Sequence, residues 1–124
     1  MTKSSRLHIV PSRFSVEHVA TATFPEDDEW VALVRAPEGL TIVREAPPWE
    51  RERCWVGLYA AVPRELDESG ILVAILDPLA RNGIPVFVAS TFHADLVLVP
   101  ETRIEAATDA LTAAGYQIAG AAAR

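Results

Sequence analysis

The order of the apolar segments after residue 54 constrains the fold more than any other feature of this sequence. Four runs rich in apolar, aromatic and β-branched residues have the length of buried strands: 55–62, 84–90, 94–99 and 116–119. Two stretches between them repeat apolar residues with helical spacing, one after the first run and one after the third. This order is the split βαββαβ arrangement of ferredoxin-like folds. We therefore expect both helices to cover one face of a four-stranded antiparallel sheet.

The first of the two expected helices carries recognisable start and stop signals. Ser69 is a candidate N-cap in front of Gly70, and Asn82 followed by Gly83 suits the end of a helix. Pro78 lies inside the same stretch, where it removes one backbone hydrogen bond and crowds the preceding turn. We therefore expect a kinked helix between these signals.

The first 52 residues contain little helix signal. Extended segments are expected at 7–10, 14–19, 30–35 and 40–44. Residues 45–53 combine adjacent prolines with alternating charges, which is typical of a linker, and Trp49 within this linker is the aromatic residue expected at an interface. The predicted class is α+β, with a strand-rich unit followed by the βαββαβ unit.

Charge and composition argue against several classes of function. The net charge of −6 disfavours a nucleic-acid partner, because such binding depends on Lys and Arg neutralising phosphates. The first ten residues lack the apolar core of a secretion signal, and no apolar run is long enough for a membrane span, so we expect a cytoplasmic protein without a membrane partner. One cysteine and three histidines without ligand spacing predict no disulfide, no metal and no cofactor.

Three short segments of the second half are more specific than a fold class. They are residues 68–72 (ESGIL), 77–80 (DPLA) and 88–99 (VASTFHADLVLV). In this combination they resemble the tandem-ACT branch of the ACT domain family, which includes stand-alone bacterial proteins and the cytosolic arginine sensor of animals. Residues 30–43 look like the family's degraded N-terminal repeat, although Gly39-Leu40-Thr41 replaces a more usual Leu-Ser.

The resemblance implies two ACT-like units in tandem, namely a truncated, strand-rich unit at residues 1–52 and an ACT domain at 53–124. It also implies regulatory ligand binding at a helix start and pairing of chains. The expected small sheet leaves one face and two edges uncovered, which likewise favours a homodimer. We therefore predict a non-catalytic regulatory protein that binds an amino-acid-like ligand.

The ligand site is expected where the first helix begins. The first N–H groups of a helix have no internal partner and lie at the positive end of its dipole, so they can hold a carboxylate. By resemblance, five positions match the ligand pocket of the arginine sensor: Glu68, Leu72, Thr91, Phe92 and Asp95. The two acids among them, Glu68 and Asp95, favour a cationic ligand. The candidate ligand-binding residues are Glu68, Ser69, Gly70, Ile71, Leu72, Thr91, Phe92 and Asp95.

Simpler interpretations stand beside this hypothesis. Ser69 can be only a cap, Glu68 only a partner of the helix dipole, and Asp95 only a turn residue that bonds its own backbone. The whole chain can be a structural dimerisation module with a vestigial pocket. A small ferredoxin-like enzyme that uses Glu68 and Asp95 as acid and base is a further alternative, although no nucleophile pattern, phosphate-binding loop or metal-ligand cluster supports it.

Overall fold

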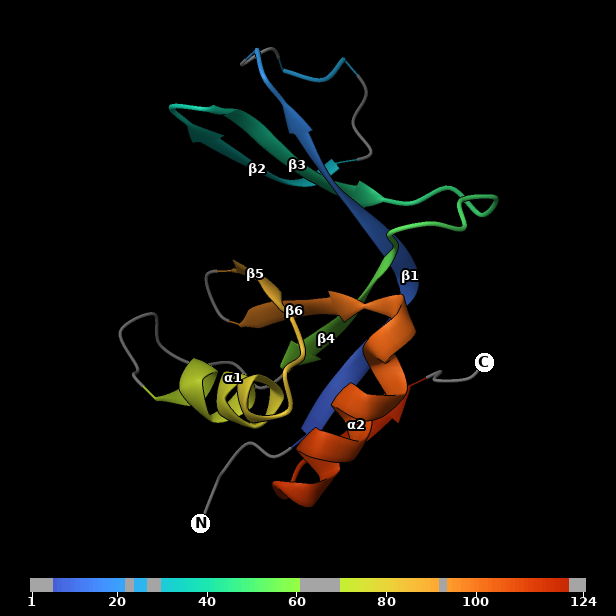
Figure 1. Ribbon diagram of the computed structural model, residues 1–124, viewed down its shortest axis with the longest axis vertical. Coiled ribbons are helices and arrows are strands. Elements are labelled where there is room, and N and C mark those ends of the chain that lie inside the picture. The colour runs from blue at the N-terminus through green and yellow to red at the C-terminus, as the bar shows by residue number, and fades with distance from the viewer. Residues whose placement is uncertain (1–5, 22–23, 27–29, 61–69, 92–93, 121–124) are drawn as a thin grey trace.

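The computed structural model describes residues 6–21, 24–26, 30–60, 70–91 and 94–120 of the chain. Its elements, labelled in Figure 1, are β1 (Arg6–Val19), β2 (Trp30–Ala36), β3 (Gly39–Glu45), β4 (Trp55–Ala60), α1 (Ile71–Arg81), β5 (Phe87–Ser90), β6 (Asp95–Pro100), the short 3-10 helix η1 (Glu101–Arg103), α2 (Ile104–Ala113) and β7 (Gln117–Gly120). This mixture confirms the predicted α+β class and the βαββαβ order of the second half. No helix in the described ranges is long and apolar enough to cross a membrane.

One long strand, β1, takes part in both ends of a single sheet. The strand order is β2-β3-β1-β4-β6-β5, and β7 also pairs with β1. Residues 6–9 of β1 pair with β7, residues 7–14 with β4, and residues 14–19 with β3. We call β4 to β7, α1, α2 and residues 6–13 the helix-covered half, and β2, β3 and residues 14–19 the strand-only half (Figure 1).

The helix-covered half differs from the expected four-stranded antiparallel sheet. β7 does not lie beside β4 in the described chain, because β1 lies between them, antiparallel to β4 and parallel to β7. The expectation of a purely antiparallel sheet formed by the second half alone was therefore wrong. Leu7 and Ile9 point into the main core, at 1% and 7% exposure, so the first strand supplies part of the core of this half.

Irregular pairing lets β1 serve both halves. Between Ile9 and Arg13 the β1–β4 register shifts, with three residues on β1 opposite Gly57 alone on β4. Pro11 lies in this segment and has no N–H to donate to a ladder, so a bulge there costs no lost donor. The predicted strands at 7–10 and 14–19 are consequently one strand with an interruption rather than two strands.

Both helices pack on one face of the sheet and form the main core with it (Figure 1). Apolar residues at helical spacing on α1 and α2 meet residues at alternating positions of the central strands, as the periodicity predicts. The fully buried members are Leu7, Leu58, Ile75, Leu79, Val97, Val99, Ala107 and Leu111.

A second, smaller core lies on the opposite face, where the strand-only half joins the rest. It contains Phe14, Val43, Leu96 and Leu98, all buried. A Cβ atom at Gly57 would lie 3.0 Å from Leu96 Cδ1 and 3.1 Å from Phe14 Cε2. Glycine at this position therefore lets the Phe14 ring pack directly against the backbone of β4.

Some predicted element ends shift for identifiable reasons. The strand expected at 84–90 begins only at Phe87, and Pro85 in the preceding segment cannot donate a ladder hydrogen bond. Residues 101–103 form the 3-10 turn η1 before α2 begins at Ile104. Pro78 does lie inside α1, and its carbonyl accepts a hydrogen bond from Asn82 Nδ2 at 2.8 Å.

Candidate functional site

The predicted ligand-site residues gather at one end of the helix-covered half. Tyr59, near the end of β4, pairs with Leu96, near the start of β6, and Ser90 pairs with Asp95 across the β5–β6 hairpin. In Figure 1 the start of α1 lies at this same end of the sheet. The fold therefore brings together a helix start and a strand start that are 25 positions apart in the sequence, at residues 70 and 95.

Gly70 forms the entry to α1 and is its N-cap residue. Its φ of 89° lies in the left-handed region that glycine adopts readily, and its carbonyl accepts the Ala74 N–H at 3.1 Å. The N-cap position thus falls on Gly70 rather than on Ser69, which had been the candidate cap. A Cβ at Gly70 would meet nothing within 4 Å among the described residues, so this helix start is open to approach.

The electrostatics of this helix start suit an anion. The first turn of α1 contains no acidic residue that would neutralise the positive end of the helix dipole. Leu72, half-buried, packs against the main core and fixes the helix there, and Ile71 is the first residue of α1. The backbone amides of this turn are therefore held in place by the core below them.

Asp95 occupies a different environment from the one expected. It is not a surface loop residue, because it begins β6 and is only 1% exposed. Ser90 Oγ donates a 2.6 Å hydrogen bond to Asp95 Oδ1 across the β5–β6 hairpin. Ser90 was not predicted from the sequence, because its contact with Asp95 depends on the register of the β5–β6 hairpin. A carboxylate buried this deeply is costly unless it is hydrogen-bonded, so Asp95 is a structural as well as a candidate binding group.

Thr91 uses its polar atoms to close the β5–β6 turn. Its hydroxyl donates to the Ala94 carbonyl at 3.1 Å and accepts the Ala94 N–H at 3.0 Å, while its own N–H donates to the same carbonyl at 2.8 Å. The side chain is exposed and lies at the same end of the sheet as Gly70. Three other predicted residues, Glu68, Ser69 and Phe92, lie outside the described residues.

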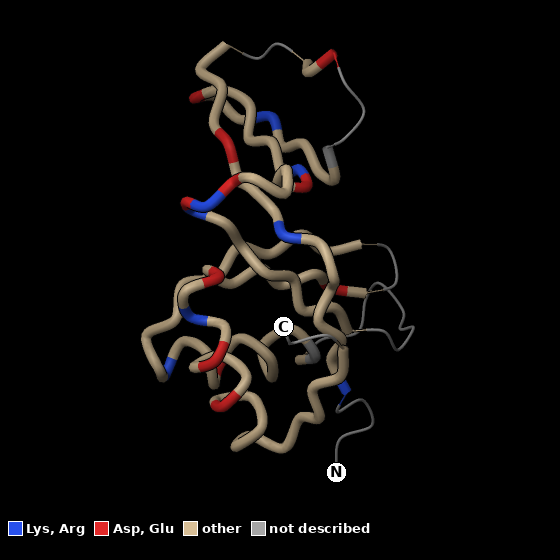
Figure 2. The backbone as a smooth tube through the Cα atoms, turned by 90° about the vertical axis from the view of Figure 1, so that its right-hand side faces the viewer, with Lys and Arg blue, Asp and Glu red and all other residues tan. Residues whose placement is uncertain are grey.

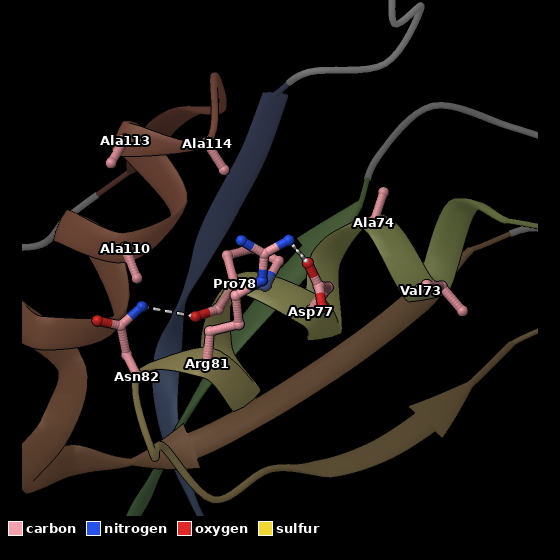
Figure 3. Close-up of a pocket in the computed structure, with 9 residues that line it drawn as sticks. All are labelled: Val73, Ala74, Asp77, Pro78, Arg81, Asn82, Ala110, Ala113 and Ala114. Atoms are coloured by element: carbon pink, nitrogen blue, oxygen red, sulfur yellow. Dashed lines mark hydrogen bonds and ion pairs between the residues drawn. The ribbon is translucent and has the colours of Figure 1, made fainter.

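Two hollows lie elsewhere on the molecule. One of about 430 Å³ lies between α1 and α2 and is lined largely by small residues, including Ala74, Ala110 and Ala113 (Figure 3). Arg81 Nη2 and Asp77 Oδ2, 2.7 Å apart, form an exposed ion pair at its rim. The other hollow, of about 620 Å³, lies in the strand-only half and includes Trp49. Neither is lined by a predicted ligand-site residue.

The groups that could support catalysis are sparse in the part of the chain that the structure describes. That part contains no cluster of three or more His, Cys, Asp or Glu residues suited to a metal ion. Cys54 is buried, and burial raises the pKa of its thiol although the nearby Arg13 guanidinium opposes this shift. The raised pKa keeps Cys54 as a thiol at neutral pH, and the thiolate is the nucleophilic form.

Comparison with known proteins identifies relatives of the chain. A family model for the ACT domain matches residues 50–113. The structure is similar to that of protein Atu0741 from Agobacterium tumefaciens, with a TM-score of 0.78, 27% identity and coverage of 96% of this chain and 95% of that one. A Vibrio cholerae protein of unknown function, described as a possible transport protein, gives a TM-score of 0.69 at 24% identity and 85% coverage of both chains.

A third similar structure is that of aspartokinase alpha and beta subunits. Its TM-score is 0.64 at 12% identity, and the match covers 90% of this chain and 98% of that one. At this identity the likeness concerns the fold alone. The match spans both halves of the present chain, so the strand-only half also has a counterpart in a solved structure.

Proposed function

The chain belongs to the ACT domain family, whose members have a regulatory, ligand-binding role, and on this premise we propose that it is a non-catalytic sensor of an amino-acid-like molecule. We place the proposed site at the end of the sheet where α1 begins. The expectation of a cytoplasmic protein rests on the sequence alone and is part of the same proposal.

The observation that carries the proposal is that the start of α1 and the buried Asp95 carboxylate lie at the same end of the sheet. The first amides of α1 have no partner within the helix and suit the carboxylate of an amino acid, and a Cβ at Gly70 would meet nothing within 4 Å among the described residues. Asp95 supplies negative charge at the same end of the sheet. The carboxylate of an amino acid would face the start of α1, and its ammonium group would face Asp95. The proposed site comprises Glu68 to Leu72 together with Thr91, Phe92 and Asp95.

Ligand-dependent stabilisation tests this function directly. A ligand that binds only the folded state raises the free energy of unfolding by about 2.7 kcal/mol at a hundredfold excess over its dissociation constant. Thermal unfolding measured with each of the twenty amino acids should therefore reveal a stabilising ligand, and a cationic amino acid is expected to have the largest effect. No shift with any amino acid would argue against the proposal.

Two glycine variants locate the site. Gly70→Val should abolish binding of the best amino acid, because a branched side chain would stand over the helix start. Gly83→Val is the matched control, since Gly83 lies beyond the other end of α1, has a φ of 69° and also faces open space. Both variants carry similar backbone strain, but only the first should lose binding in calorimetry. Equal binding by the two would place the site elsewhere.

A structural dimerisation module is the second candidate function. β2 pairs with β3 alone in the described sheet, and Val34 on β2 is 51% exposed, which suits contact with another chain. Thr91 and Asp95 also have structural roles in the β5–β6 hairpin, as a vestigial pocket would require. A dimer whose stability no amino acid alters would support this second function over the first.

We further propose that residues 1–52 are a truncated ACT-like unit and that residues 53–124 form the ACT domain. Three strands of the strand-only half follow one another without a described helix between them, in keeping with a unit that has lost its helices. The contribution of β1 to the sheet of the second half supports this proposal with a reason for keeping such a remnant, since Leu7 and Ile9 belong to the main core.

A further inference from the structure

The hollow in the strand-only half has walls of two kinds. One wall consists of Ser15 and Glu17 from β1 with Arg44 and Glu45 from β3, and the register pairs Ser15 directly with Arg44. The other wall is the loop of residues 46–50. This loop leads toward the start of β4, whereas the proposed amino-acid site lies beyond the opposite end of that strand. The hollow is therefore separate from the site at the start of α1.

Arg13 holds the loop wall in place. Its Nη2 donates to the carbonyls of Glu50 at 2.9 Å and Pro48 at 3.3 Å, and its backbone carbonyl accepts the Ala46 N–H at 2.8 Å. Its Nη1 lies 3.3 Å from Glu101 Oε1, which ties the same guanidinium to the end of β6. The loop is thus positioned before any ligand arrives, so little ordering cost remains for binding.

This fixed loop presents Trp49 to solvent. The residue lines the hollow and is 76% exposed, the highest value among the large apolar residues described as exposed. An indole in water forgoes the gain from burial, and aromatic residues of this kind commonly anchor binding when a partner covers them. The face of a tryptophan ring also attracts organic cations more strongly than the rings of the other aromatic residues do.

The carboxylates that line the hollow favour a cation, although Arg13 and Arg51 also bring guanidinium groups to the Pro48 carbonyl of the loop. Arg44 Nε lies 3.4 Å from Glu17 Oε2, so the one guanidinium that lines the hollow already faces a carboxylate. Glu45 and Glu50 add two further carboxylates to the lining residues. Figure 2 shows acidic and basic positions close together around the junction of the two halves, within a chain of net charge −6. The lining residues together carry more negative than positive charge.

We propose that the hollow between the Trp49 loop and the β1–β3 ladder is a second binding site, specific for a small organic cation with a guanidinium or ammonium group. Trp49 provides the apolar and cation–π contact, and Glu50 provides the opposing charge, since the Glu17 carboxylate already faces Arg44. The ligand of this site needs no carboxylate, because no helix begins among the lining residues to bind one. This requirement distinguishes the second site from the proposed amino-acid site.

Butylguanidinium, which has no carboxylate, is the appropriate probe. Titration into the full chain should shift the Trp49 indole N–H resonance in a saturable manner, with that resonance assigned by its loss in Trp49→Phe. Affinity measured from the backbone amides of Ser15 and Arg44 should fall about tenfold in Trp49→Ala and less in Trp49→Phe, which keeps an aromatic ring. Gly70→Val should bind butylguanidinium normally, so this test is independent of the amino-acid site.

Charge and shape are separated by matched controls. Glu50→Gln should weaken binding about threefold, while its amide keeps an oxygen that can accept the Glu52 N–H. Glu105→Gln, an exposed change on α2, removes the same charge far from the hollow and should have no effect. Butylurea, the neutral isostere, should not bind. Equal binding of butylurea, or unchanged affinity in Trp49→Ala, would overturn the proposal.

Discussion

The sheet is covered differently in the two halves of the molecule. In the helix-covered half, α1 and α2 seal one face over a core whose central members, such as Leu58 and Leu79, are fully buried. In the strand-only half the sheet is covered only by a smaller apolar cluster around Phe14 and Val43. The large apolar side chains that remain exposed in residues 1–52 are Phe24, Val31, Val34 and Trp49. In the described remainder of the chain, Val73 is the one large apolar side chain that is similarly exposed.

This difference indicates a division of roles. The helix-covered half buries enough apolar surface to stabilise the fold, and β1 extends that stability to strands with little core of their own. Exposed apolar residues are then concentrated where the core is thin, which is where contacts with other molecules gain most from burial.

Leu79→Ala should be the most damaging change. The side chain is fully buried between α1 and the sheet, so its truncation leaves a cavity and should lower the free energy of unfolding by about 3 kcal/mol. Val34→Ala in the strand-only half should cost less than about 0.5 kcal/mol, because Val34 is 51% exposed. Chemical denaturation of both variants checks the comparison. Similar losses would show that the two halves depend equally on their apolar side chains.

Asp95→Ala should destabilise the unliganded protein by about 2 kcal/mol. The change removes a buried acceptor of the 2.6 Å hydrogen bond from Ser90 and leaves space at the start of β6. Ser90→Ala, which removes the donor from an exposed residue, should cost less. Denaturation without ligand measures both effects. A fully stable Asp95→Ala variant would show that Asp95 is not needed for folding, and only its proposed role in ligand binding would then remain.

Homodimer formation stays a prediction. We expect the interface in the strand-only half, because most of the exposed apolar side chains lie there. β2 pairs with β3 alone in the described sheet, so its other edge and Val34 are available to a second chain. The wild type should have a mass near twice 13.5 kDa in light scattering at micromolar concentration. Val34→Lys should weaken dimerisation at least tenfold, which is about 1.4 kcal/mol. Val73→Lys on α1 is the control, and dissociation caused by it instead would place the interface on the helices.

Asp77→Asn should have the smallest effect. The Asp77–Arg81 ion pair is short, at 2.7 Å, but both side chains are largely exposed and four residues apart on α1. Such pairs contribute about 0.3 to 0.5 kcal/mol, and salt screens them. Thermal unfolding at low and high salt should therefore differ little between the variant and the wild type. A loss above 1 kcal/mol would show that the rim of the hollow between α1 and α2 has a larger structural role.

The sequence alone determined the local features of this protein. Alternating and helical apolar spacing identified the strands and the two α-helices of the second half and the core-facing positions Ile75 and Leu79 on α1, but it divided β1 into two strands and did not separate η1 from α2. The ESGIL, DPLA and VASTFHADLVLV segments in combination indicated the ACT family, and the family model confirms it. These features are readable because secondary structure and its buried face follow from side chains that are close in sequence.

Only the tertiary structure decided which distant elements meet. Alternation at Leu7 and Ile9 predicts a strand with one buried face, but it does not indicate that this strand lies between β4 and β7. The hydrogen bond that holds the buried Asp95 comes from Ser90, five residues earlier on the neighbouring strand. The loop that carries Trp49 is likewise held by Arg13, which is 35 residues from Pro48. Hydrogen bonds between strands join backbone groups that are the same in every residue, so the choice of neighbour depends on the packing of the whole sheet.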